Sequence, residues 1–167
     1  EINEKNLPPD HKDIATYLNN LAAVYSHQGK FSDAEKLLKR SLAIDEKAFG
    51  AEALEIVTDL NNLATVYTAQ GKYAQAEPLC RRALEIKEKK FGPEAVEIVK
   101  ILDNLASIYS YQNKLPEAEK LLRRSLDINV KTSGVDNPNV VVALNNLALV
   151  YEMQGKLMEA EGLYKNA

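Results

Sequence analysis

Asparagine side chains recur at a fixed interval along the chain, and they are the residues best suited to hydrogen-bond a ligand. Asn20, Asn62, Asn104 and Asn146 each follow the previous one by 42 residues. A side-chain amide both donates and accepts, so a row of amides can hold the backbone of an extended peptide without reading its sequence. The alternative is that each amide bonds a neighbouring helix of the same chain. We favour the first interpretation.

Residues suited to catalysis or metal binding are scarce. The chain has two histidines and one cysteine, and His27 has no nucleophile in the same register of the repeat. Cys80 follows Leu79 on the apolar face of an expected helix, so we predict a buried thiol that acts as a small hydrophobic side chain. We therefore predict no catalytic residue, no metal site, no cofactor and no enzymatic activity.

Composition narrows the class of partner. A net charge of −3 argues against nucleic acid as the main partner, because binding phosphates needs a basic face. No apolar run approaches the roughly 20 residues needed to cross a bilayer, and residues 1–5 do not read as a signal peptide. A single cysteine excludes an internal disulfide and fits a reducing compartment. The expectation is a cytoplasmic protein with no membrane partner.

The same 42-residue interval governs the whole chain and predicts its elements. Leu18-Asn19-Asn20-Leu21-Ala22 returns three times, starting at Leu60, Leu102 and Leu144. Each copy carries an apolar stripe of helical spacing, then a break at Gln-Gly-Lys, then a second amphipathic helix. Asn113 replaces the glycine of the break in the third copy. The fold predicted is all-α, a right-handed solenoid of antiparallel helix pairs.

The pattern Leu-x2-Leu-Ala-x2-Tyr followed by Ala-x3-Leu resembles the tetratricopeptide (TPR) repeat, whose usual period is about 34 residues. The longer period, with the Leu-Asn-Asn-Leu-Ala and Gln-Gly-Lys segments, is similar to the TPR domains of the kinesin light chain class. The resemblance implies that the first helix of each pair lines a concave groove that binds short peptides of partner proteins. It also implies that His11 belongs to an inter-repeat element that caps the following helix.

In kinesin light chains the groove binds a tryptophan flanked by acidic residues, and basic side chains assist. By register, the resemblance places Asn62, Lys87, Lys100 and Asn104 in that arrangement, whereas Ser26 stands where the family has another basic residue. Solvated surface charge is an equally good interpretation of Lys87 and Lys100. Stepping along the first helices gives the residues expected to face the groove in the third and fourth repeats: Lys100, Asn104, Ser107, Tyr111, Val142, Asn146, Leu149 and Met153.

The repeat register divides the chain into a single array, 1–167. We expect residues 1–7 to be the tail of a preceding repeat, followed by repeats at 8–49, 50–91 and 92–133 and a truncated repeat at 134–167. Both ends would then fall in mid-repeat, so we expect self-association through uncapped ends. The apolar side chains in the fourth repeat, Val142, Leu149 and Met153, have two interpretations. They could make a hydrophobic contact with a ligand, or the helices of a following repeat could cover them. We favour the second.

The leading hypothesis is a protein-interaction scaffold that binds linear peptides in its groove, as in cargo or adaptor recognition. Two alternatives stay open. One is a structural or self-associating array that docks folded partners without using the groove. The other is a regulatory domain of a larger signalling protein. Mutations in the groove would separate the first hypothesis from the second.

Overall fold

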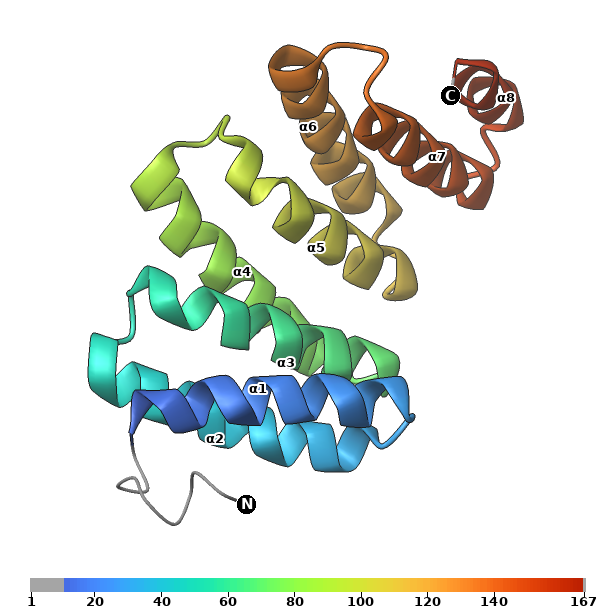
Figure 1. Cartoon of the computed structure of the whole chain (residues 1–167). Helices are drawn as coiled ribbons and strands as arrows, with labels where there is room; N and C mark the ends of the chain where they lie inside the picture. Colours follow the sequence, from blue (N-terminus) through green and yellow to red (C-terminus); the bar gives the residue numbers. More distant parts are fainter. Residues whose placement is uncertain (1–10, 167) are drawn as a thin grey trace. The chain divides into compact units, whose positions relative to one another are not determined.

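The structure, a computed structural model, describes residues 11–166, and in that range the regular elements are all helical (Figure 1). The expected tail at residues 1–7 lies outside the described residues. In chain order the elements are α1 (Lys12–His27), α2 (Phe31–Phe49), the 3₁₀ helix η1 (Leu54–Ile56), α3 (Val57–Ala69), α4 (Tyr73–Phe91), the 3₁₀ helix η2 (Val96–Ile98), α5 (Val99–Tyr111), α6 (Leu115–Ser133), α7 (Pro138–Met153) and α8 (Leu157–Lys165). Within residues 11–166, none of these helices has the length and apolarity to cross a membrane.

The chain forms two compact units, Glu1–Ile86 and Lys87–Ala167, called here the N-terminal and C-terminal units. In the N-terminal unit, α1 and α2 form a hairpin and α3 packs against α2. In the C-terminal unit, α5, α6, α7 and α8 pack each against the next. Ala22 and Ala34 are fully buried, as small residues must be where two helices approach closely. The core of each unit is mainly aliphatic, with Leu38 and Leu102 among its buried side chains.

The breaks predicted at Gln-Gly-Lys are turns that need a left-handed backbone. Gly71, between α3 and α4, has a φ of 72°. Asn113, which takes the place of glycine in the third repeat, has a φ of 58°. Asparagine is the residue that best tolerates this conformation after glycine, so the substitution keeps the turn.

We expect Gly71→Ala to lower the free energy of unfolding by about 1 kcal/mol, and Gly71→Asn by about half as much. A Cβ at Gly71 would meet no atom within 4 Å, so the loss reflects the backbone conformation alone. The control is Gly162→Ala inside α8, where φ is not positive and space is also open. That variant should gain about 0.5–1 kcal/mol in urea denaturation. A loss at Gly162 equal to that at Gly71 would contradict the backbone argument.

In two of the helix pairs, the first helix begins with a residue whose side chain caps the helix N-terminus. His11 precedes α1, and its Nδ1 accepts a hydrogen bond from the backbone N–H of Asp13 at 3.3 Å. Asn137 precedes α7, and its Oδ1 accepts from the N–H of Asn139 at 2.9 Å. The expected capping role of His11 is confirmed.

A cluster of charged side chains at the edge of the core connects one helix pair to the next. In the N-terminal unit, Glu35 of α2 lies 2.7 Å from the ammonium of Lys39 and 2.8 Å from that of Lys72. Both ammonium groups lie over the ring of Tyr67, 5.7 and 5.5 Å from its centroid. The hydrogen bonds from Lys39 and Lys72 lower the pKa of Glu35 to about 2. Such a glutamate stays ionised through the neutral range and holds the two lysines in place.

The same cluster recurs in the C-terminal unit around Glu119 of α6. Its carboxylate accepts hydrogen bonds from Arg123, Tyr151, Gln154 and Lys156. Burial opposes ionisation of Glu119, but these donors outweigh it and bring the pKa of that carboxyl to about 2. The repeated tyrosine and the repeated glutamate are therefore parts of one repeat-to-repeat contact.

Candidate groove in the C-terminal unit

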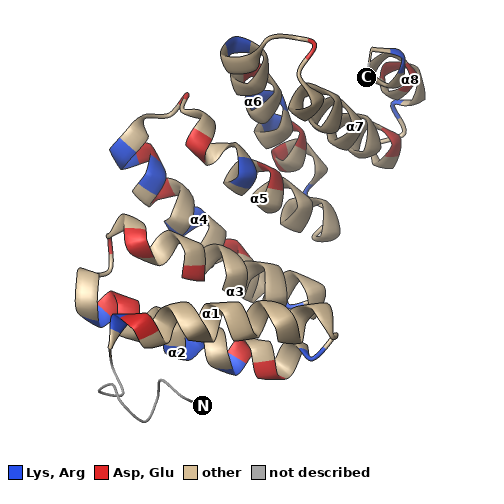
Figure 2. Cartoon of the chain, viewed as in Figure 1, with Lys and Arg blue, Asp and Glu red and all other residues tan. Residues whose placement is uncertain are grey.

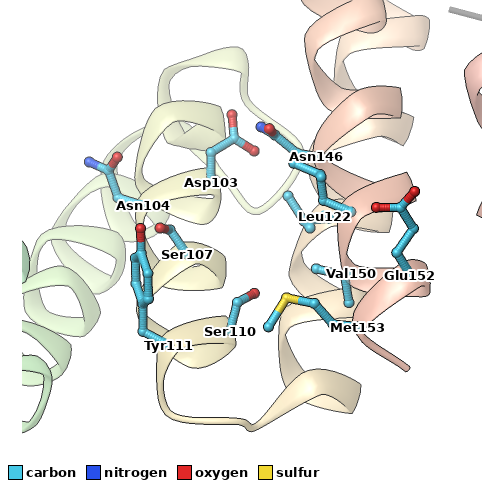
Figure 3. A pocket seen from close by; sticks show the side chains of 11 residues that line it. Asp103, Asn104, Ser107, Ser110, Tyr111, Leu122, Asn146, Val150, Glu152 and Met153 are labelled. Carbon is cyan, nitrogen blue, oxygen red and sulfur yellow. The ribbon is translucent and has the colours of Figure 1, made fainter. Parts of the chain in front are cut away.

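A groove with a volume of about 470 Å³ opens in the C-terminal unit, with α5 on one side and α7 on the other (Figure 3). Amides, hydroxyls, two carboxyls and aliphatic side chains all reach it. The lining residues are Asp103, Asn104, Ser107, Ser110, Tyr111, Leu122, Asn146, Leu149, Val150, Glu152 and Met153. This mixture suits a ligand that offers both backbone polar groups and a large apolar side chain.

The helical stepping predicted most of these positions. Six of the eight residues expected to face the groove in the third and fourth repeats do line it: Asn104, Ser107, Tyr111, Asn146, Leu149 and Met153. Asn104 and Asn146 are half-buried in its walls. Leu149 and Met153 are 51% and 54% exposed, so in this structure the groove presents an open apolar floor. These six side chains form the candidate binding surface.

The two asparagines of the N-terminal unit lie in different surroundings. Asn20 is exposed on α1. Asn62 of α3 is half-buried, and its Nδ2 donates a hydrogen bond to Asn19 Oδ1 of α1 at 3.0 Å. At Asn62, therefore, the amide makes a helix-to-helix bond, which was the alternative interpretation of the ladder. One donor hydrogen of its amide remains for a ligand.

The two lysines are not among the residues that line the groove. Lys87 lies in the C-terminal part of α4, and its ammonium donates to the backbone carbonyl of Glu97 at 2.8 Å. Lys100 is exposed near the start of α5, one turn before Asn104. Lys87 therefore holds η2 against α4, and Lys100 lies near the N-terminal end of the α5 wall of the groove.

The repeat pattern did not reveal a polar network in the N-terminal unit. The Nδ2 atom of Asn19 donates to Asp59 Oδ1 at 2.7 Å and to Ser41 Oγ at 2.8 Å. Asp59 of α3 is only 1% exposed. An acid at an otherwise apolar helix position was a visible signal, but its partner could be found only once α1, α2 and α3 were packed.

Charge is sparse on the helices that line the groove. Figure 2 shows α7 without charge along most of its length, with Glu152 near its end. On α5 the charged residues are Lys100 and Asp103. Over residues 11–166, no three potential ligand side chains come together as a metal site would require. Cys80 is fully buried as predicted, and burial raises the pKa of its thiol to about 12.

Sequence comparison establishes the family. The tetratricopeptide repeat matches residues 55–129 and 97–167, and a second form of the same repeat matches residues 14–52. The chain therefore belongs to the tetratricopeptide repeat family, and the all-α solenoid fold predicted from its period is confirmed. TPR repeats mediate protein–protein interactions, and this chain is an interaction scaffold of that kind. No curated protein matches it.

Solved structures define the class within the family. Nearly identical TPR-like repeats from a protein assigned to the kinesin light chains of Podosopora anserina are 26% identical to this chain, with a TM-score of 0.85. The match covers 99% of this chain and 78% of that one. BtubC (BKLC) from P. vanneervenii has the same fold, with a TM-score of 0.85, 22% identity, and coverage of 96% and 65%. The 42-residue repeats are thus of the kinesin light chain-like class.

Proposed function

We propose that the groove of the C-terminal unit binds a short extended segment of a partner protein. Asn104 and Asn146 would hydrogen-bond the backbone of that segment, one from each wall. Leu149 and Met153 would bury one large apolar side chain of the ligand. The observation that carries the proposal is the conjunction of two half-buried amides with an open apolar floor in one groove.

The energetics favour such a ligand over water. Covering two aliphatic side chains that are about half exposed removes apolar area from water, at roughly 25 cal/mol per Å². The amides supply direction, because each hydrogen bond to a peptide backbone only replaces one to water. The apolar pair should therefore set most of the affinity, and the asparagines the orientation of the peptide.

The experiment is a selection of displayed twelve-residue peptides on the purified chain, followed by fluorescence polarisation with the enriched peptides. The test variant is Leu149→Ser with Met153→Ser, and its expected effect is an affinity about tenfold weaker. The matched control is Leu157→Ser with Met158→Ser on α8. Those two residues have the same chemistry, are 66% and 84% exposed, and lie outside the groove.

Peptides that bind the wild type and the α8 variant alike, and the groove variant weakly, would support the proposal. An absence of enriched peptides, or equal binding to all three proteins, would overturn it. In that case the structural or self-associating array, or a regulatory role in a larger protein, would be the better reading of the repeats.

The acidic, tryptophan-containing peptide implied by the kinesin light chain resemblance is a distinct candidate within the same function. It needs Lys87 and Lys100 as selecting charges, with Asn62 and Asn104 as clamps. One observation stands against it: Lys87 is engaged by a backbone carbonyl. A tryptophan-acidic peptide therefore belongs in the binding assay beside the selected peptides.

A further inference from the structure

One difference between the groove and the equivalent place in the N-terminal unit is the position of an aspartate. In the N-terminal unit the amide of Asn19 receives a hydrogen bond from Asn62 and gives one to buried Asp59. In the C-terminal unit, 84 residues later, Asp103 stands in the place of Asn19 and Ala143 in the place of Asp59. The aspartate therefore lies between helices in the N-terminal unit and in the wall of the groove in the C-terminal unit.

This exchange leaves the carboxyl of Asp103 short of donors. Its Oδ1 atom is buried and receives no hydrogen bond from the described residues. Burial raises the pKa of Asp103, and the neighbouring Ser125 hydroxyl lowers it only in part. Figure 3 shows the carboxyl on the α5 wall, facing Asn146 across the groove. The side chain as a whole is half-buried and lines the groove, so a ligand donor that contacts it there would stabilise its charge.

The remaining charge in the groove has the same sign. Glu152 lies on the α7 wall. None of the eleven lining residues is a lysine or an arginine. A ligand carboxylate would therefore meet two acids here, whereas a ligand cation would find complementary charge beside the apolar Leu149 and Met153.

We propose that the groove selects peptides in which a lysine or arginine lies within a few residues of a large apolar side chain, the cation bonding Asp103 and the apolar group covering Leu149 and Met153. This inference rests on the proposed function, since it names the class of peptide that the same groove takes. It departs from the acidic ligand that the family resemblance implies.

The test uses a panel of fluorescent nine-residue Gly-Ser peptides that contain one leucine and one variable residue. The variable residue is arginine, its neutral isostere citrulline, or glutamate, placed one to four positions on either side of the leucine. The same three-way replacement is made in the peptides recovered by display. We expect arginine to bind about tenfold more tightly than citrulline, as one charge-assisted hydrogen bond predicts, and glutamate to bind most weakly.

The decisive variant is Asp103→Asn, which should bring the arginine-to-citrulline ratio down to about twofold or less. Asparagine occupies this register at Asn19, Asn61 and Asn145, so the fold accommodates it. The matched control is Asp136→Asn in the exposed segment between α6 and α7, which should keep the wild-type ratio.

The outcomes separate the two proposals. Peptides that bind through Leu149 and Met153 but prefer citrulline or glutamate would overturn the selectivity and leave the groove function standing. A preference for arginine that survives Asp103→Asn would also overturn it. If no peptide binds in a manner that depends on Leu149 and Met153, both proposals fail together.

Discussion

Replacing Asn19 with alanine is expected to lower the free energy of unfolding of the N-terminal unit by about 2–3 kcal/mol. Asn19 holds three helices together through four side-chain contacts. Its Nδ2 donates to Asp59 Oδ1 and Ser41 Oγ, at 2.7 and 2.8 Å, and its Oδ1 accepts from Asn62 at 3.0 Å. The fourth is a longer hydrogen bond to the Ala15 carbonyl, 3.4 Å. In the alanine variant the carboxyl of Asp59, a residue only 1% exposed, would lose this hydrogen-bond donor.

Urea denaturation followed by far-ultraviolet circular dichroism measures this loss. The control is Asn20→Ala, the adjacent residue in the same helix, whose side chain is exposed. Removing it should change the free energy of unfolding by no more than about 0.5 kcal/mol. Equal losses at the two positions would mean that helix propensity, rather than the network around Asp59, accounts for the effect.

The sequence predicted the features that repeat. A strict interval of 42 residues was enough to place helix pairs, and one helical step was enough to name Asn104, Asn146, Leu149 and Met153 as neighbours. The burial of Cys80 followed from its place on an apolar stripe. Each of these depends only on the periodicity of one helix or on the register between copies.

The sequence did not predict the contacts of residues that differ between copies of the repeat. Asp59 and Asp103 each occupy a position where the other copies have a different residue, and their partners come from helices distant in the chain. Asn19 contacts Asp59, 40 residues away, and Lys87 contacts the carbonyl of Glu97. Such pairings depend on how two particular helices pack, and no single-helix pattern contains that information. The contact of Lys87 could not be found from the sequence for the same reason.

A second effect follows from the same network, because Asp59 also faces Asp45 of α2. The charge of Asp59 lies close enough to Asp45 to disfavour a second negative charge there. Burial raises the pKa of Asp45 to about 6, and the nearby charge of Asp59, its hydrogen bond and the charge of Glu55 add to the shift. An unpaired aspartate titrates at 3.8.

The direction of the pH dependence follows from these two values. Between about pH 3.8 and 6 the folded chain keeps a proton on Asp45 that the unfolded chain has lost. The stability that this proton contributes is fully present below the unfolded pKa, and it declines as pH rises through the folded pKa. Above about pH 6 the pair carries two charges at close range, and the N-terminal unit is less stable than it is in mild acid.

We therefore expect Asp45→Asn to raise the free energy of unfolding by about 2 kcal/mol near neutral pH, and by little in mild acid. The full shift corresponds to about 1.4 kcal/mol per pKa unit, and partial solvent exposure reduces it. The asparagine amide carries no charge, so it avoids the repulsion that an ionised Asp45 meets from Asp59. Asn129 occupies the same register in the third repeat and is buried there, so the fold accepts the amide.

The measurement is the difference in urea midpoint between Asp45→Asn and the wild type at about pH 4.5 and about pH 7.5. Taking the difference removes the titration of all groups that the two proteins share. Asp136→Asn, an exposed acid, should show the same small difference at both values. If Asp45→Asn gained stability equally at both, the gain would come from lost surface charge. A gain confined to the higher pH would instead show that an ionised Asp45 destabilises the contact between α2 and α3.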